Sequence, residues 1–254
     1  MRTVFITGAS SGIGAACAEV LAGTGQYRIL MCARRADKLE NLKQQIINKF
    51  PEIEIYTFQL DVRNKEEVFS TIENLPEEWK NIDVLINNAG LSQGLDALQD
   101  GDTDDWDRMI DTNVKGLLYV SRAVIPLLKE STKQTHIVNI GSIAGKEVYP
   151  NGNVYCATKH AVDALNKAMR IDLLPFGIKV TAINPGMVET EFSEVRFKGD
   201  KERAKNVYTG LVPLSGYDIA ETINFVLSRP AHVNINDLLI MPTAQATGTI
   251  VNRK

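Results

Sequence analysis

Short apolar segments alternate with longer segments of helical periodicity along the whole chain. The short segments are continuously apolar and rich in β-branched residues, a pattern typical of parallel strands that are covered on both faces. The predicted strands are Thr3–Thr7, Ile29–Cys32, Glu54–Gln59, Val84–Asn87, His136–Ile140, Lys179–Asn184 and Leu238–Met241. The predicted helices are Gly12–Ala22, Asp37–Phe50, Lys65–Leu75, Asp105–Lys129, Asn153–Leu174 and Asp218–Ser228.

This regular alternation predicts an α/β fold of the Rossmann type, a doubly wound parallel sheet of about seven strands with helices on both faces. A chain of 254 residues suits one such domain. No internal repeat, low-complexity tract or flexible linker divides it. We therefore expect a single dinucleotide-binding and catalytic domain over residues 1–254.

One segment interrupts the alternation of predicted strands and helices. Residues Gly186–Thr209 follow the sixth predicted strand and carry many charges before the alternation resumes. In a doubly wound sheet such a segment lies beyond the carboxyl end of a strand, where ligands bind. A mobile substrate lid over residues 186–209 is one interpretation. A passive surface excursion is the other, although passive loops of this length are uncommon in compact domains.

The first predicted strand runs into a glycine-rich segment at the start of a βαβ unit. Gly8 permits a sharp turn, Gly12 lets the backbone approach a pyrophosphate, and Gly14 allows the next helix to pack on the strand. The start of that helix presents free N–H groups and a positive dipole end to phosphates. This position favours a dinucleotide site over an ordinary glycine turn. The candidate cofactor-binding residues are Gly8, Ser10, Ser11, Gly12, Ile13 and Gly14.

The second predicted strand ends in Arg34 and Arg35, at the distance from the glycines where an NAD site would place Asp or Glu for the ribose 2′-hydroxyl. Two guanidiniums can instead hold a 2′-phosphate. NADP is therefore the predicted cofactor, and a solvated arginine pair before a helix is the alternative interpretation.

Two further segments close predicted strands. Asp61 and Val62 end the third strand, where an adenine could be held. Asn88, Ala89 and Gly90 follow the fourth strand, and their small size leaves room for backbone beside a nicotinamide ribose. The sequence NNAG also suits an ordinary turn.

The candidate chemistry lies in Ser142, Tyr155 and Lys159, with Asn113 upstream. Tyr155 and Lys159 are four residues apart on a predicted helix, so their side chains share a face. A nearby ammonium and an oxidised nicotinamide would favour phenolate, so Tyr155 could exchange a proton with a carbonyl or alcohol oxygen. Ser142 could hydrogen-bond the same oxygen.

Each of these residues also has an ordinary interpretation. A Tyr–Lys pair is usually surface decoration, and Ser142 after a glycine is usually part of a turn. Asn113 is a mediocre helix former, which suggests either a water-binding or kink role or a partly exposed polar residue. Their conjunction with the glycine-rich turn favours a catalytic site.

On these motifs the chain resembles the short-chain dehydrogenase/reductase family along essentially its whole length. The resemblance is carried by TGASSGIG at 7–14, NNAG at 87–90, Asn113, Ser142, YCATK at 155–159 and PGMVET at 185–190. It implies a tetrad in which Asn113 holds a relay water, Ser142 orients the substrate and Tyr155 is the acid/base. Lys159 would bind the nicotinamide ribose and lower the tyrosine pKa. The resemblance also implies that the cofactor contacts Tyr155, Lys159, Pro185, Gly186, Val188 and Thr190. It further implies a homotetramer built on the two long helices.

Within the family, the chain is similar to the NADP-dependent 3-hydroxy acid dehydrogenases through TEFSEVRFKGD at 190–200 and PAHVNINDLLIMPT at 230–243. This similarity implies interconversion of serine, allo-threonine or 3-hydroxypropionate and the corresponding carbonyl compound. Asn151 stands where that group has glycine, beside the substrate pocket. A hydroxy acid needs a cation for its carboxylate, and Arg196 or Lys198 could supply it. A solvated charged loop is the alternative interpretation of both residues.

Charge and cysteine content narrow the possibilities. A net charge of −3 provides no basic field for nucleic acid or anionic lipid. No apolar run approaches the roughly 18 residues of a membrane helix, and the chain opens on a strand without a secretion signal. Three widely spaced cysteines and scattered histidines argue against a metal site. We expect a cytoplasmic enzyme with a small-molecule substrate and no metal.

Two other functions remain open at this stage. An NADPH-dependent carbonyl or 3-oxoacyl reductase would share the chemistry, although no basic patch for an acyl carrier stands out. A non-catalytic NADP-sensing protein would keep the fold but would be expected to lose Tyr155 or Lys159, and both are present.

Overall fold

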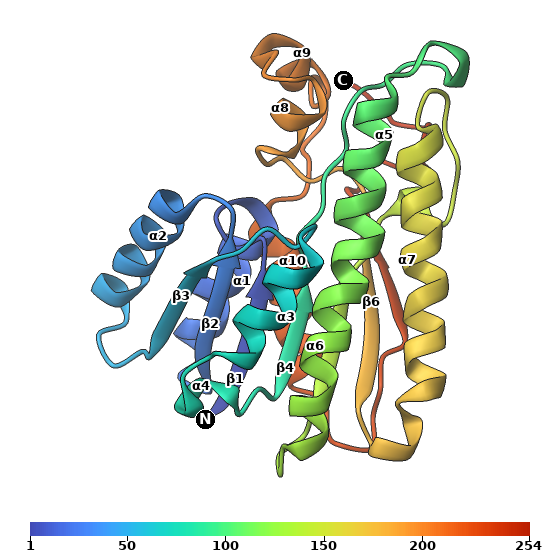
Figure 1. Ribbon diagram of the computed structural model, residues 1–254. Coiled ribbons are helices and arrows are strands. Elements are labelled where there is room, and N and C mark those ends of the chain that lie inside the picture. Colours follow the sequence, from blue (N-terminus) through green and yellow to red (C-terminus); the bar gives the residue numbers. More distant parts are fainter.

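The computed structural model describes residues 1–254, which form a seven-stranded parallel sheet with the order β3-β2-β1-β4-β5-β6-β7 (Figure 1). The strands are β1 (Arg2–Thr7), β2 (Tyr27–Ala33), β3 (Ile55–Gln59), β4 (Val84–Asn87), β5 (His136–Ile140), β6 (Lys179–Pro185) and β7 (Asp237–Ile240). All seven predicted strands are present, and β7 begins one residue earlier than predicted. The strand order reverses between β1 and β4, which places a ligand crevice at the carboxyl ends of these strands.

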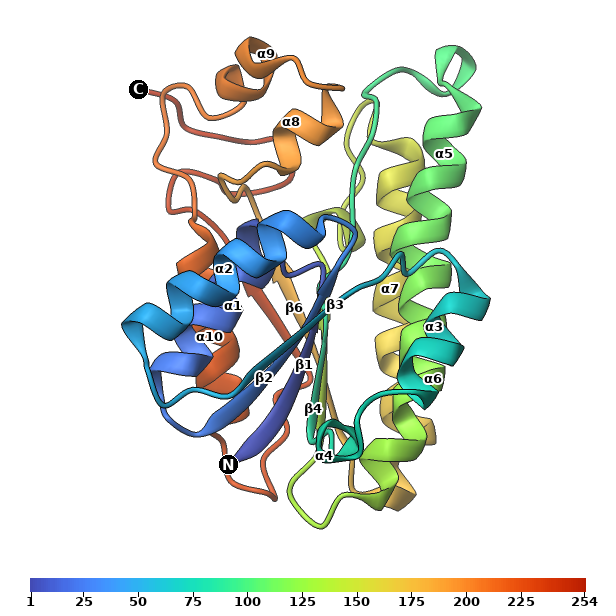
Figure 2. The ribbon, with the colours of Figure 1, turned by 60° about the vertical axis from the view of Figure 1, so that its left-hand side comes forward.

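Helices cover both faces of the sheet, as predicted (Figure 2). They are α1 (Gly12–Gly23), α2 (Ala36–Lys49), α3 (Lys65–Glu73), α4 (Glu77–Lys80), α5 (Thr103–Ile110), α6 (Leu117–Glu130), α7 (Asn153–Asp172), α8 (Phe192–Arg196), α9 (Lys201–Asn206) and α10 (Gly216–Leu227). Helices α1, α2 and α10 lie on one face, and α3, α6 and α7 lie on the other (Figures 1 and 2). No helix is both long enough and apolar enough to cross a membrane.

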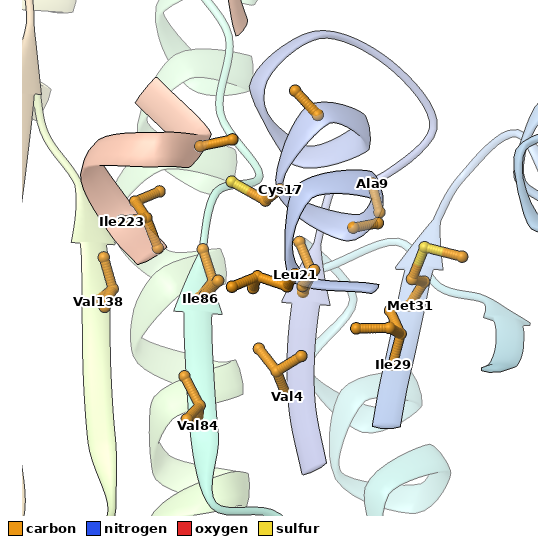
Figure 3. Close-up of a cluster of buried hydrophobic side chains, with 14 of the residues drawn as sticks. Val4, Ala9, Cys17, Leu21, Ile29, Met31, Val84, Ile86, Val138 and Ile223 are labelled. Atoms are coloured by element: carbon orange, nitrogen blue, oxygen red, sulfur yellow. The ribbon is translucent and has the colours of Figure 1, made fainter. Parts of the chain in front are cut away.

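Fully buried apolar side chains pack between the sheet and the helices on each face. On the first face, Val4 of β1 packs in one cluster with Leu21 of α1 and Ile223 of α10 (Figure 3). On the second face, Leu85 of β4 belongs to a cluster with Val124 of α6. Burial on both faces explains why the strands are continuously apolar in sequence.

The predicted helix Asp105–Lys129 is not continuous. A π-helical turn over Asp111–Gly116 separates α5 from α6. The sequence sign of this turn is Asn113, a weak helix former for which a kink was one interpretation. Such insertions occur frequently at functional sites, and this one contains Asn113.

Residues 186–209 are not an open loop, because they contain α8 and α9. Both helices lie beyond the carboxyl ends of the strands (Figure 1). The segment is joined to the chain that follows it by a bridge between Val188 and Leu214. We refer to residues 186–209 as the lid segment.

Candidate active site

A cleft of about 580 Å³ opens at the carboxyl ends of the strands, beneath the lid segment. Most of the predicted site residues line it, whereas Gly14, Asn113 and Lys198 do not. The predicted residues that line it are Gly8, Ser10, Ser11, Gly12, Ile13, Arg34, Arg35, Asp61, Val62, Asn88, Ala89, Gly90, Ser142, Tyr155, Lys159, Pro185, Gly186, Val188, Thr190 and Arg196.

The glycine-rich turn between β1 and α1 requires its glycines. Gly8 and Gly12 have φ angles of 66° and 59°, in the left-handed region that side chains disfavour. A Cβ atom on Gly14 would lie 2.5 Å from Nδ2 of Asn88, so Gly14 serves close packing. The Asn88 amide donates to the carbonyl oxygens of Thr7 at 2.8 Å and Gly8 at 3.1 Å. The segment after β4 is therefore a clamp on the glycine turn, more than an ordinary turn.

The start of α1 and the end of β2 form a candidate anion site. Ser11 is the N-cap of α1 but makes no side-chain cap, which leaves the first N–H groups open to a ligand. Arg35 donates to Ser11 Oγ at 2.8 Å and to Ser10 Oγ at 3.1 Å, and Arg34 lines the same cleft. These residues fit a dinucleotide that carries an additional phosphate on its ribose.

Asp61 lies just past β3 and pairs with Arg63. Burial opposes ionisation of the carboxyl, but hydrogen bonds from Arg63 hold the pKa of Asp61 below its usual range. The Nε atom of Arg63 donates to both carboxylate oxygens at 3.0 Å. The carboxylate thus already has a partner, and a contact with adenine stays a prediction.

The side chains of Tyr155 and Lys159 lie one turn apart on α7, and both are buried. The Lys159 Nζ atom donates to the carbonyl oxygen of Ile140 at 2.9 Å and lies 6.0 Å from the centroid of the Tyr155 ring. Ser142 follows β5, and its N–H donates to Asn184 Oδ1 at 3.2 Å. The structure therefore brings Ser142, Tyr155 and Lys159 together at the cleft.

Burial dominates the electrostatics of the Tyr155 phenol, and its acidification by Lys159 together with an oxidised nicotinamide stays a prediction. Burial raises the pKa of Tyr155, against the opposing charge of Arg196 and a hydrogen bond with Ser142. Burial also lowers the pKa of Lys159 to about 8. Lys159 is directed toward the Ile140 carbonyl, so Arg196 is the cation that favours the phenolate in this state. The phenol is consequently protonated and suited to donate its proton.

Asn113 is buried, contrary to the interpretation of a partly exposed residue. Its Oδ1 accepts from the Leu91 N–H at 2.8 Å, and its Nδ2 donates to the Leu91 carbonyl at 2.8 Å and to Thr158 Oγ1 at 3.1 Å. The side chain thus ties the segment after β4 to α7 from within the π-helical turn. A relay water held by Asn113 stays a prediction, because its side-chain atoms are already engaged.

Arg196, at the end of α8, reaches into the catalytic part of the cleft. Its Nε donates to Ser92 Oγ at 3.0 Å, and its Nη2 donates to the Tyr149 hydroxyl at 3.3 Å. The guanidinium lies 5.2 Å from the ring centroid of Tyr155 and 5.3 Å from that of Phe192. This geometry places a positive charge beside the phenol.

Lys198 does not enter the cleft, which corrects the expectation that it could serve a substrate carboxylate. Its Nζ pairs with Asp102 at 3.1 Å and with Asp105 at 2.9 Å, on the α5 side of the lid segment. The sequence could not separate the two lid cations, because the short helix α8 decides which of them points inward.

Sequence reasoning missed Tyr149, Glu191 and Phe192, which also line the cleft. Tyr149 lies in an irregular loop without a recognisable pattern, and Glu191 follows directly on the predicted contact Thr190. Asn151 has a φ angle of 62°, so it keeps the left-handed backbone that a glycine would adopt.

Comparisons with known proteins agree with this fold. The family model described as short chain dehydrogenase matches residues 2–201. The NADP-dependent 3-hydroxy acid dehydrogenase of Schizosaccharomyces pombe is 43% identical over 253 residues, covering 100% of this chain and 97% of the relative. Sulfoacetaldehyde reductase 2 of Chromohalobacter salexigens is 42% identical over 243 residues, covering 96% and 95%. The closed form of serine dehydrogenase complexed with NADP+ superimposes with a TM-score of 0.92 at 41% identity, covering 100% of both chains.

Proposed function

Because this chain belongs to the short-chain dehydrogenase family, we propose that it interconverts a 3-hydroxy acid and the corresponding carbonyl compound with NADP as cofactor. It is an oxidoreductase acting on CH–OH groups. The substrates in view are serine, allo-threonine and 3-hydroxypropionate. The observation that carries this proposal is the position of Arg196, an anion-binding group, beside Tyr155 in the cleft.

The choice of NADP is supported by the end of β2. Arg35 contacts both serines of the glycine-rich turn, and Arg34 lines the cleft beside it. Arginine is well suited to phosphate because its guanidinium presents a rigid fork of donors. When bound, NADP supplies the hydride acceptor and NADPH the hydride donor.

The chain's own residues handle the proton. In the reductive direction the Tyr155 hydroxyl donates its proton to the carbonyl oxygen of the substrate. The Ser142 hydroxyl donates a hydrogen bond to the same oxygen and stabilises its developing charge. In the oxidative direction the tyrosine accepts the proton, and the positive charge of Arg196 favours the phenolate.

A cleft that binds anionic substrates suits the compounds for which two of the relatives are named. One relative is named for 3-hydroxy acids and another for sulfoacetaldehyde. Malonic semialdehyde and sulfoacetaldehyde both carry an anionic group one methylene away from the carbonyl carbon. A guanidinium next to the proton donor suits both.

We also propose that the protein is a cytoplasmic homotetramer. Helices α6 and α7 lie side by side (Figure 1), and Leu118 of α6, Ile171 of α7 and Leu174 just after α7 expose 38%, 71% and 75% of their surface. All three cysteines are unpaired, which suits a reducing compartment. Light scattering after gel filtration should give four times the chain mass of 28.1 kDa, and a monomeric mass would contradict the tetramer.

The function is tested by the absorbance of NADPH at about 340 nm while the protein oxidises L-serine, allo-threonine and 3-hydroxypropionate with NADP or NAD. We expect turnover with NADP, much weaker turnover with NAD and none in Tyr155→Phe. Silence on the acids together with reduction of neutral carbonyls would favour the carbonyl reductase alternative. Silence on both, with tight NADPH binding, would favour a sensing protein.

A further inference from the structure

One carboxylate of the lid segment is held by two cations of the cofactor half of the molecule. Glu191, the residue before α8, accepts from Arg35 Nη1 at 2.8 Å and from Lys38 Nζ at 2.6 Å. Arg35 precedes α2 and Lys38 lies in its first turn. The two oxygens of the carboxylate each take one cation, so Glu191 bridges them.

This bridge lies where the additional phosphate of the cofactor is expected. Arg35 simultaneously donates to Ser10 and Ser11 of the glycine-rich turn, which fixes its guanidinium at the ribose end of the dinucleotide site. Glu191 lines the same cleft. The carboxylate therefore satisfies the donors that a 2′-phosphate would use.

The Glu191 carboxylate is ionised, but a phosphate can displace it from Arg35 and Lys38. The hydrogen bonds from Lys38 and, secondarily, from Arg35 lower the pKa of Glu191 to about 2, despite some burial, so the group is ionised at any physiological pH. The three side chains expose between 39% and 43% of their surface. Ion pairs of such exposure are weak, whereas a phosphate carries more charge and more acceptor oxygens.

On the basis of the function proposed above, we infer that Glu191 and Lys38 determine specificity for the 2′-phosphate. Lys38 is a second cation for that phosphate beside Arg35. Glu191 is an internal competitor that holds both cations until the phosphate displaces it. A cofactor with a 2′-phosphate therefore displaces Glu191 from Arg35 and Lys38, and a cofactor with a free 2′-hydroxyl leaves both ion pairs in place.

Calorimetric titration with adenosine 2′,5′-bisphosphate and with 5′-AMP tests this inference without any turnover. Glu191→Gln should strengthen binding of the bisphosphate by about threefold to tenfold, since two partly exposed ion pairs no longer compete. Binding of 5′-AMP should change by less than about twofold, and the gain should shrink at high salt. Lys38→Gln should weaken binding of the bisphosphate and spare 5′-AMP.

Glu194→Gln is the matched control, because it removes an acidic charge from the same helix at a residue that makes no ion pair. An equal gain in Glu194→Gln would overturn the competition, as would unchanged or weaker bisphosphate binding in Glu191→Gln. If the unmodified protein binds the bisphosphate no more tightly than 5′-AMP, the assignment of NADP itself fails. If the unmodified protein prefers the bisphosphate over 5′-AMP but Glu191→Gln does not change bisphosphate binding, only the role of Glu191 is refuted.

Discussion

The guanidinium of Arg196 lies over the ring of Tyr155, with its carbon 5.2 Å from the ring centroid. Arg196 comes from the lid segment and Tyr155 from α7, so the pair joins the covering element to the acid/base candidate. Hydrogen bonds to Ser92 and Tyr149 hold the guanidinium in place. A cation fixed in this way can serve a substrate anion and the phenol together.

The role of Arg196 predicts a selective defect. Arg196→Ala should raise KM for 3-hydroxypropionate by about tenfold to hundredfold, since hydrogen bonds to charged groups contribute roughly 1.5–3 kcal/mol. The KM for 1-propanol, a neutral alcohol, should change far less, whereas kcat should fall on both substrates because the charge of Arg196 also favours the Tyr155 phenolate. Lys198→Ala removes the other lid cation, which lies outside the cleft, and should leave both substrates unaffected. Equal increases in KM for the acid and the neutral alcohol would refute the anion role of Arg196.

The proton donor can be removed with little change in shape. Tyr155→Phe should lower kcat by at least about 10²–10⁴-fold, the usual contribution of a general acid. Calorimetry should still detect NADPH binding, because the glycine-rich turn and Arg35 remain intact. If the kcat of Tyr155→Phe fell by less than about tenfold, another group would have to supply the proton.

Lys159 predicts a dependence of stability on pH. Its folded pKa of about 8 lies below the ordinary value of 10.5, so between these values the unfolded chain binds the proton and the folded chain does not. Folding stability therefore rises with pH across this window and is lowest below it, by about 3 kcal/mol for this group. Lys159→Met should be more stable than the unmodified protein in urea at neutral pH. The difference should vanish above the ordinary lysine pKa, and a pH-independent difference would contradict this account.

Asn113 is predicted to be a structural clamp. Asn113→Ala leaves the buried N–H and carbonyl groups of Leu91 without partners, which should lower the free energy of unfolding by about 2–4 kcal/mol. Thr158→Val removes only one of the three hydrogen bonds of Asn113 and should cost less. Urea denaturation of both variants measures the difference. A loss no larger in Asn113→Ala than in Thr158→Val would contradict the clamp.

The sheet was predictable because its strands are buried on both faces and therefore read as continuous apolar runs. The position of Tyr155 and Lys159 in the cleft was predictable because they occur at helical spacing in a chain with a recognisable nucleotide turn. Neither inference needed long-range contacts.

Features that depend on contacts between distant segments could not be predicted. The π-helical turn at Asp111–Gly116 is accompanied by hydrogen bonds between Asn113 and Leu91, which leave no trace in the local periodicity. The pairing of Glu191 with Arg35 joins residues separated by 156 positions. Glu191 is far from the arginines in the sequence, and the fold brings it to Arg35 from the lid segment.

We propose that the cleft selects an anionic substrate and that Tyr155 passes a proton to it. The most direct measurement compares kcat/KM for NADPH-dependent reduction of malonic semialdehyde and of propanal, which differ by the carboxylate. We predict that malonic semialdehyde is preferred by about tenfold or more, the effect of a charged hydrogen bond to Arg196. Equal kcat/KM values for the two aldehydes would contradict the assignment of this protein to hydroxy acids.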